Sequence, residues 1–212
     1  MLPKKFRKFH DGDTLTAQGY DIVIRRKKIG DLDMRSGSLV ACDPLHYMET
    51  EPFETHIDSG TYPVVLLIAQ LRDDKRMAYA MVRVRNTEPI RWEKAHLPGD
   101  SPDSGDSDAG FPVDSSVACF MDAETATMLL DYTHAVMPDD DEFERALHSG
   151  FNRHRKHGYS WACVDLKRDV KLPHADHMNM CAFESGFGPG VYQTWIGYDE
   201  NEDVSKIVTD FD

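Results

Sequence analysis

Long hydrophobic segments are missing from this sequence. Its longest apolar run is VVLLIA at residues 64–69, whereas a helix that spans a bilayer needs roughly 20 consecutive apolar residues. The basic N-terminal stretch is not followed by an apolar segment or by a small-residue cleavage site, so it lacks the pattern of a secretory signal. The sequence therefore predicts a cytoplasmic protein that makes no membrane contact.

Cysteine is scarce, and no two cysteines are close in sequence. The chain has four, each in a short apolar context: Cys42, Cys119, Cys163 and Cys181. Zinc sites usually contain Cys-x2-Cys pairs, which are absent here. Isolated thiols among apolar residues are typical of small buried side chains in a reducing compartment. We therefore expect buried free thiols rather than a zinc site.

Lysine and arginine are fewer than aspartate and glutamate outside the N-terminal segment. Residues 1–28 carry a net charge of +5 and the remaining residues −18, which together give the formal net charge of −13. A surface of this sign repels phosphate groups, so the sequence predicts no binding to nucleic acid. We interpret residues 1–29 as a basic, partly ordered N-terminal extension that either contacts an acidic partner or is simply solvated.

What the chain does contain is a series of strand-like segments interrupted by two helical ones. Strand patterns occur at residues 36–44, 62–71, 76–85, 115–122, 191–198 and 204–211. Short polar loops predict hairpins between the second and third of these and between the last two, and the alternation in 76–85 predicts one buried face.

The two helical segments lie in the middle of the chain. The first covers residues 123–136 with Asp122 as its N-cap, and the second begins after the acidic residues 139–141 and ends near Gly158. We therefore expect an α+β fold: a β-rich single domain over residues 30–212, with mostly antiparallel strands and two central helices.

The segment at residues 98–110 has no apolar anchor. It consists of Pro, Gly, Ser and Asp with one Ala, and such a composition does not repay the entropy lost on ordering. The sequence thus predicts a mobile acidic loop. Its closely spaced aspartates suggest calcium binding as an alternative, but the glutamate that ends an EF-hand loop is absent.

Three glycines alternate in the stretch FESGFGPGVYQTW at residues 183–195. A dinucleotide-binding loop needs a helix after its glycines, and strand-forming residues follow here instead. A nucleophile turn would place Ser185 between glycines, but residue 183 is Phe. We interpret Gly186, Gly188 and Gly190 as a structural turn that leads into a strand.

Several acids end strand-like segments and are candidates for chemistry. Asp43, Asp114 and Asp210 do so, and with Glu184 and Ser185 they form the candidate set for a hydrolase that uses carboxylates or a metal-bound water. Aspartate at a strand end is also ordinary turn chemistry.

Histidines and aromatic residues supply two weaker candidate sites. His174 and His177 have the spacing of a metal-binding pair but lie in a predicted loop, where solvated histidines are the more common case. Trp92, Tyr192 and Trp195 are candidates for contact with a small ligand, although aromatic residues in strands more often pack in the core.

Five stretches of the chain occur in an order known from other proteins. They are SGSLVACDP (36–44), DSGTYPVVL (58–66), RWEKA (91–95), GFPVDSSVACFMD (110–122) and FESGFGPGVYQTWIGYDENEDVSKIVTDF (183–211). Together they resemble domain-of-unknown-function family 4241, a bacterial family without an established activity. The resemblance implies a single domain but no cofactor or catalytic residue. In that family the glycine turn reads G-x-G-D-G, so Pro189 replaces an acid, which favours a structural turn here.

These residues form no coherent catalytic constellation, and we expect no cofactor. Our preferred interpretation is a non-catalytic acidic binding protein whose partner is a basic protein, for example a toxin that it neutralises. The alternative is the hydrolase, which requires the candidate acids to meet in one pocket. The oligomeric state stays open.

Overall fold

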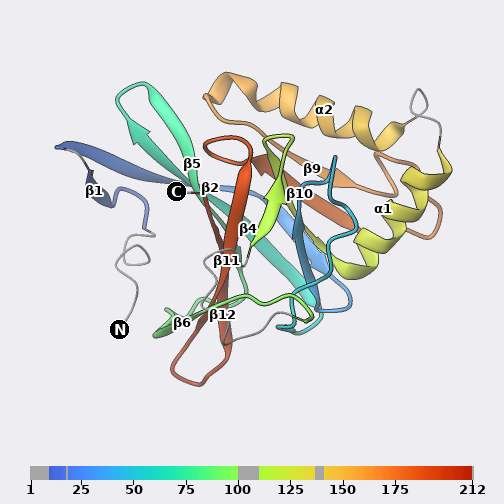
Figure 1. Ribbon diagram of the computed structural model, residues 1–212, viewed down its shortest axis with the longest axis horizontal. Helices are drawn as coiled ribbons and strands as arrows, with labels where there is room; N and C mark the ends of the chain where they lie inside the picture. The colour runs from blue at the N-terminus through green and yellow to red at the C-terminus, as the bar shows by residue number, and fades with distance from the viewer. Residues whose placement is uncertain (1–9, 18, 100–109, 137–140, 212) are drawn as a thin grey trace.

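A computed structural model describes residues 10–17, 19–99, 110–136 and 141–211 of the chain. Two antiparallel sheets pack face to face, and both long helices cover the outer face of the smaller sheet (Figure 1). This arrangement confirms the predicted α+β fold in a single domain.

The larger sheet has eight strands and combines segments from both ends of the chain. Its order is β1-β2-β4-β5-β12-β11-β6, and β7 pairs with the start of β11. The strands are β1 (Thr14–Ala17), β2 (Tyr20–Met34), β4 (Gly60–Leu71), β5 (Asp74–Arg83), β6 (Arg91–Lys94), β7 (Phe111–Val113), β11 (Gly190–Tyr198) and β12 (Val204–Asp210).

The smaller sheet carries the helices. Its strand order is β3-β8-β10-β9, formed by Leu39–Cys42 (β3), Val117–Asp122 (β8), Asn179–Glu184 (β10) and Trp161–Asp165 (β9). Helices α1 (Ala123–Ala135) and α2 (Glu142–His154) follow β8, and a 3-10 turn (η3, Arg155–His157) ends at Gly158. Leu129 of α1 with Phe143 and Leu147 of α2 fill the space over this sheet. The two predicted helices are thereby confirmed.

The predicted hairpins and the predicted helix cap are also present. β4 and β5 are joined by a tight turn, since Leu71 pairs directly with Asp74, and β11 pairs with β12 along most of its length. The buried Asp122 side chain accepts a hydrogen bond from the backbone N–H of Glu124, which satisfies one of the free donors at the start of α1.

The expectation of one buried face in residues 76–85 was wrong. Ala80 and Val82 pack between the sheets, but Tyr79 and Met81 are 3% and 0% exposed on the opposite face of β5, where they contact a second cluster that includes Val65. Residues 79–82 alternate between large and small side chains, all of which are largely apolar. Because Tyr and Met are apolar enough for burial, their alternation with Ala and Val does not mark a face in contact with water.

The predicted boundary at residue 29 falls inside β2. This strand pairs with β4 from Val23 to Met34, so the basic residues 25–28 belong to the larger sheet. Backbone pairing places no condition on the charge of side chains that point outward. The predicted acidic loop at 98–110 lies outside the described residues except at its two ends.

The helices of the described segments are short. None of them is long and apolar enough to cross a lipid bilayer.

Close packing of α2 on β9 gives a test of the helix–sheet contact. An added Cβ at Gly150 would lie 2.4 Å from the Cβ of Ala162. Gly→Ala inside a helix normally stabilises by about 1 kcal/mol, but overpacking costs ~1–3 kcal/mol. We expect Gly150→Ala to lower the free energy of unfolding by up to about 2 kcal/mol in urea titrations. The control is Ser149→Ala at the exposed neighbouring position; a more stable Gly150→Ala protein would contradict the packing described here.

Candidate functional site

A single buried carboxylate fastens the segment that follows β3. Asp43 is 0% exposed and accepts hydrogen bonds from the backbone N–H groups of Leu45, Asp114 and Ser115 at 2.9, 2.9 and 2.7 Å. The hydroxyl of Ser115 donates a further bond at 2.8 Å. The loop after β3 and the turn between β7 and β8 are therefore joined through one side chain.

These hydrogen bonds keep Asp43 ionised. Burial by itself would raise the pKa of Asp43, but the bonds donated by Ser115, Leu45 and Asp114 outweigh it, and the pKa is lowered. His46, whose ring is about half exposed, places its Nδ1 3.3 Å from Asp43 Oδ2. The buried charge thus has partners in the backbone and one at the surface.

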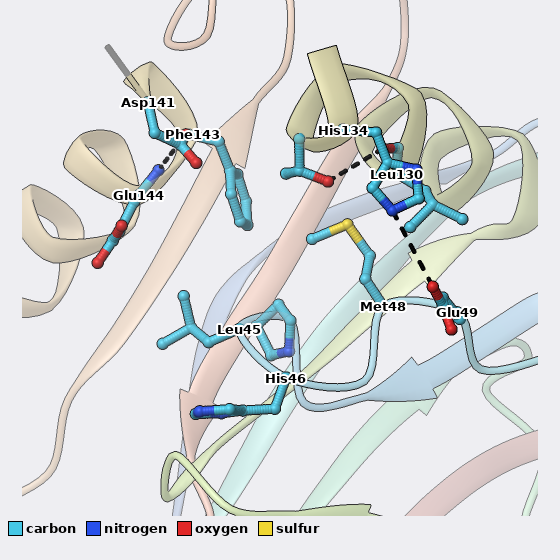
Figure 2. Close-up of a pocket in the computed structure, with 11 residues that line it drawn as sticks. Leu45, His46, Met48, Glu49, Leu130, His134, Asp141, Phe143 and Glu144 are labelled. Carbon is cyan, nitrogen blue, oxygen red and sulfur yellow. Dashed lines mark hydrogen bonds and ion pairs between the residues drawn. The ribbon is translucent and has the colours of Figure 1, made fainter. Parts of the chain in front are cut away.

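A cleft with an apolar floor opens beside this loop. It has a volume of about 340 Å³ and lies between residues 44–49, the end of α1 and the start of α2. Figure 2 shows Met48, Leu130 and Phe143 reaching toward one another from these three segments. The floor continues the cluster that packs the helices on the smaller sheet.

Acidic side chains stand on both sides of this floor. Asp141 is the N-cap of α2, and Glu144 lies in the first turn of this helix. Glu49 lies across the cleft beside His134, with 4.0 Å between Glu49 Oε1 and His134 Nε2 (Figure 2). Asp141 also accepts a hydrogen bond from the Glu144 N–H and so caps the helix. We call this region, with Glu49, Asp141 and Glu144 above the apolar floor, the acidic cleft.

The acidic cleft has a defined chemical preference. Its carboxylates attract a cation, and its floor accommodates methylene groups. Lysine and arginine combine these two features in one side chain, since an apolar stem carries a charged head. The arrangement is therefore complementary to a basic side chain presented by another molecule.

A second cleft of about 360 Å³ lies on the other side of Leu45. Its lining includes Ser116, Glu184 and Arg155. Ser116 has a φ of 64°, a left-handed conformation that is uncommon for residues other than glycine. The preceding residue, Ser115, donates hydrogen bonds from its backbone N–H and its hydroxyl to Asp43. These two bonds hold the turn that contains Ser116.

Four of the five predicted hydrolase residues gather around this turn. The backbone N–H of Asp114 donates to the Asp43 carboxylate, and the Ser185 N–H donates to the Ser116 carbonyl at 3.0 Å. Glu184 lines the second cleft. Asp210 does not join them. It lies on β12 next to Phe211, which points into the core between the sheets, so the Asp210 side chain is directed to the opposite face of the larger sheet.

The gathered residues are largely occupied by bonds within the protein. Ser185 is 1% exposed, and its hydroxyl donates to the Gly188 carbonyl at 2.7 Å. Asp114 accepts a 2.6 Å hydrogen bond from the Tyr47 hydroxyl. These bonds shape the loops rather than expose a nucleophile.

The glycine turn has conformations that glycine favours. Gly186 and Gly188 have φ values of 62° and 99°, and a Cβ at Gly186 would lie 2.5 Å from the Met77 carbonyl oxygen. The Tyr192 hydroxyl lies 2.6 Å from the Gly188 carbonyl oxygen and holds the turn against β11. Gly190 is the first residue of β11.

The aromatic and histidine candidates do not form joint sites. Tyr192 faces the core between the sheets, whereas Trp92 and Trp195 pack against the cluster on the outer face of the larger sheet. His174 and His177 are both exposed in the segment between β9 and β10. Across the described ranges, no three His, Cys, Asp or Glu side chains are grouped so that they could hold a metal ion.

Comparison with known proteins identifies the family. A family model described as "Protein of unknown function (DUF4241)" matches residues 32–209. The chain belongs to this family. Neither a curated protein nor a solved structure matches the DUF4241 chain.

The family match includes both clefts. Every residue that lines them lies within the matched range, as do Asp43 and the glycine turn of this DUF4241 chain. The sequence patterns did not predict the acidic cleft, where Glu49, Asp141 and Glu144 line the same pocket as His46 and His134. The one available signal was the acidic run before α2, which was interpreted only as a helix start.

Asp43 is the residue whose loss should most disturb this region. Asp43→Asn places an amide donor opposite the N–H donors, and we expect the free energy of unfolding to fall by about 2–4 kcal/mol. Asp114→Asn is the control, since this exposed side chain has one hydroxyl partner and should cost less than about 1 kcal/mol. Equal losses in the two variants would contradict the anchoring role.

The pH dependence follows from the lowered pKa of Asp43. In the unfolded chain the pKa is about 3.9, above the folded value, so the stabilisation is complete above that pH and is lost as the pH falls through the folded value. Urea titrations between about pH 6 and pH 3 should therefore show a steeper loss of stability for the wild type than for Asp43→Asn.

Proposed function

We propose that this DUF4241 chain is a non-catalytic binding protein whose acidic cleft receives a basic side chain of a protein partner. The observation that carries the proposal is the placement of Glu49, Asp141 and Glu144 around an apolar floor. The cleft is of the size of small ligand sites, and its charge has the sign of the whole molecule.

The charge distribution also favours fast and selective association. A net charge of −13 attracts a basic protein over distances of about a Debye length, ~8–10 Å at physiological salt. Charges at the rim of an interface raise the association rate and reject partners of the same sign. The acidic cleft then supplies a local position for one cationic side chain of the captured partner.

The hydrogen-bonding roles of the hydrolase candidates support binding over catalysis. Asp43 is surrounded by donors from the backbone, and Ser185 is buried and donates to the Gly188 carbonyl. A nucleophile must instead reach a substrate and a general base. Asp210 lies on another face of the larger sheet.

A double variant that removes two negative charges tests the cleft. We expect Glu49→Gln/Glu144→Gln to weaken binding of a fluorescein-labelled oligolysine peptide by roughly three- to ten-fold in fluorescence anisotropy at low salt, since each exposed ion pair contributes ~0.2–1 kcal/mol. Added salt should reduce this difference, because screening weakens interactions between exposed charges.

The matched control removes the same net charge elsewhere. Asp73→Asn/Glu200→Gln changes two exposed acids, one in the β4–β5 turn and one in the β11–β12 loop. This double variant should bind the peptide nearly as the wild type does. If both double variants lose affinity equally, attraction is a property of total charge and the cleft is not the site.

Neutralisation of a toxin is the specific form of this function that we propose. If a basic toxic protein is encoded beside this gene, co-expression with the wild-type chain should restore growth of the host. Glu49→Gln/Glu144→Gln should restore growth less well, and Asp73→Asn/Glu200→Gln should act as the wild type. Failure of the wild-type chain to protect against, or to bind, any such neighbouring product would contradict the toxin-neutralising role.

A further inference from the structure

Two pairs of cysteines face each other across strands of the smaller sheet. Cys42 on β3 is opposite Cys119 on β8, and Cys163 on β9 is opposite Cys181 on β10. The sulfur atoms lie 3.6 Å apart in the first pair and 3.4 Å apart in the second, and all four thiols are free. The register of the sheet thus creates two dithiols that are not apparent from the sequence spacing.

The two dithiols differ in their surroundings. Cys42 and Cys119 are completely buried and pack among the residues beneath the helices. Cys163 and Cys181 lie on the other face of the same sheet and pack toward the larger sheet. Cys163 is partly exposed, whereas the other three cysteines are buried. The second pair is therefore the one that a small reagent in solution can reach.

Strand β2 is shaped around the sulfur of Cys163. A Cβ at residue 30 would lie only 2.7 Å from Cys163 Sγ, and Gly30 avoids that contact. The pairing of β2 with β4 is irregular between Lys28 and Gly30, and Cys163 Sγ lies 3.3 Å from the carbonyl oxygen of Ile29. The sulfur therefore occupies a position that the neighbouring strand leaves open.

The register and the sulfur contact of this pair are compatible with a disulfide. Directly opposite residues on antiparallel strands have Cα atoms about 4.5–5.5 Å apart, within the ~4.4–6.8 Å that a disulfide spans. The sulfurs are already in contact, so side-chain rotation suffices to bring them to bonding distance. We propose that Cys163 and Cys181 form a redox modification site, a dithiol that a two-electron oxidant such as hydrogen peroxide converts into a disulfide.

Cys163 is the member that reacts first, because it is the partly exposed thiol of the pair and Cys181 is buried. Its hydrogen bond with Cys181 lowers the pKa of the Cys163 thiol, although burial acts in the opposite direction, and the same bond raises the pKa of Cys181. The Cys163 thiolate attacks one peroxide oxygen, the O–O bond breaks, and a sulfenic acid and hydroxide form. The hydroxide takes up the proton that the thiol lost and becomes water.

The second step closes the bond. The Cys181 sulfur attacks the sulfenic sulfur, and the S–O bond breaks as the S–S bond forms. The departing hydroxide takes the Cys181 proton to give a second water. Two thiols and one hydrogen peroxide thus give one disulfide and two waters, with the sulfurs oxidised and the peroxide reduced. A dithiol reductant reverses the reaction.

Peptide mapping of the wild-type protein tests the proposal without any variant. The reduced, folded chain is treated with hydrogen peroxide, its remaining thiols are alkylated after denaturation, and tryptic peptides are analysed by mass spectrometry. Lys167, Arg168 and Lys171 separate Cys163 from Cys181, so a disulfide appears as a cross-linked peptide pair. We expect this cross-link, loss of two of the four thiols, alkylated Cys42 and Cys119, and full recovery of thiols with dithiothreitol.

Two variants separate the steps. Cys181→Ala removes the resolving thiol, and dimedone should then trap a sulfenic acid on Cys163. Cys42→Ala is the matched control and should form the Cys163–Cys181 cross-link as the wild type does. A cross-link between Cys42 and Cys119 that forms as fast, or oxidation that leaves Cys163 and Cys181 as thiols in the wild-type protein, would overturn the proposal.

Discussion

The buried carboxylate of Asp43 is the interaction on which the functional region depends. Its donors come from the loop after β3 and from the turn between β7 and β8. Since β7 pairs with β11, the same side chain links the smaller sheet to the larger one. A buried charge is tolerated only while its hydrogen bonds are complete. Leu45, which separates the two clefts, is therefore held in place by electrostatics rather than by burial of its own side chain.

Acidic residues serve two different purposes in this chain. Asp43 and Asp122 are fully buried, and each binds N–H donors and a serine hydroxyl; Asp122 accepts from Ser36 and from the start of α1. Glu49 and Glu144 are exposed at the acidic cleft. The buried acids are committed to the fold because their lone pairs are already used. The exposed acids have histidine partners at the surface, since Glu144 Oε1 lies 3.3 Å from His148 Nε2 and Glu49 Oε1 lies 4.0 Å from His134 Nε2. Such exposed pairs are weak, so a cationic side chain of another molecule can compete for these carboxylates.

The two faces of the smaller sheet carry separate features. The face beneath the helices leads to the acidic cleft, and the opposite face holds Cys163 and Cys181 against β2. Successive side chains of a strand point to opposite faces of the sheet, so alternate residues of the same strands contribute to the two features. The proposed association at the cleft and the proposed oxidation of the thiols thus involve different faces of one sheet.

Local patterns were sufficient for part of the fold. The predicted strand segments correspond to β3, β4, β5, β8, β11 and β12, whereas β1, β2, β6, β7, β9 and β10 were not predicted. The hairpin turns, the Asp122 cap and the two helices follow from residues that are neighbours in sequence, and the family resemblance indicated a single domain. These features depend on backbone preferences and short-range hydrogen bonds, which a sequence displays directly. The burial of Tyr79 and Met81 was not predictable in this way, because it depends on what covers the outer face of β5.

The residues of the candidate site are brought together only by the tertiary structure. Glu49, His134 and Glu144 come from three segments whose separation in sequence contains no signal of their proximity. The pairing of Cys163 with Cys181 and the outward direction of Asp210 depend on strand register, and a shift of one residue would reverse both. The sequence by itself indicated the two helices, part of the strands and the sign of the charge. Only long-range packing decided which side chains meet, since contacts between distant segments depend on the whole fold.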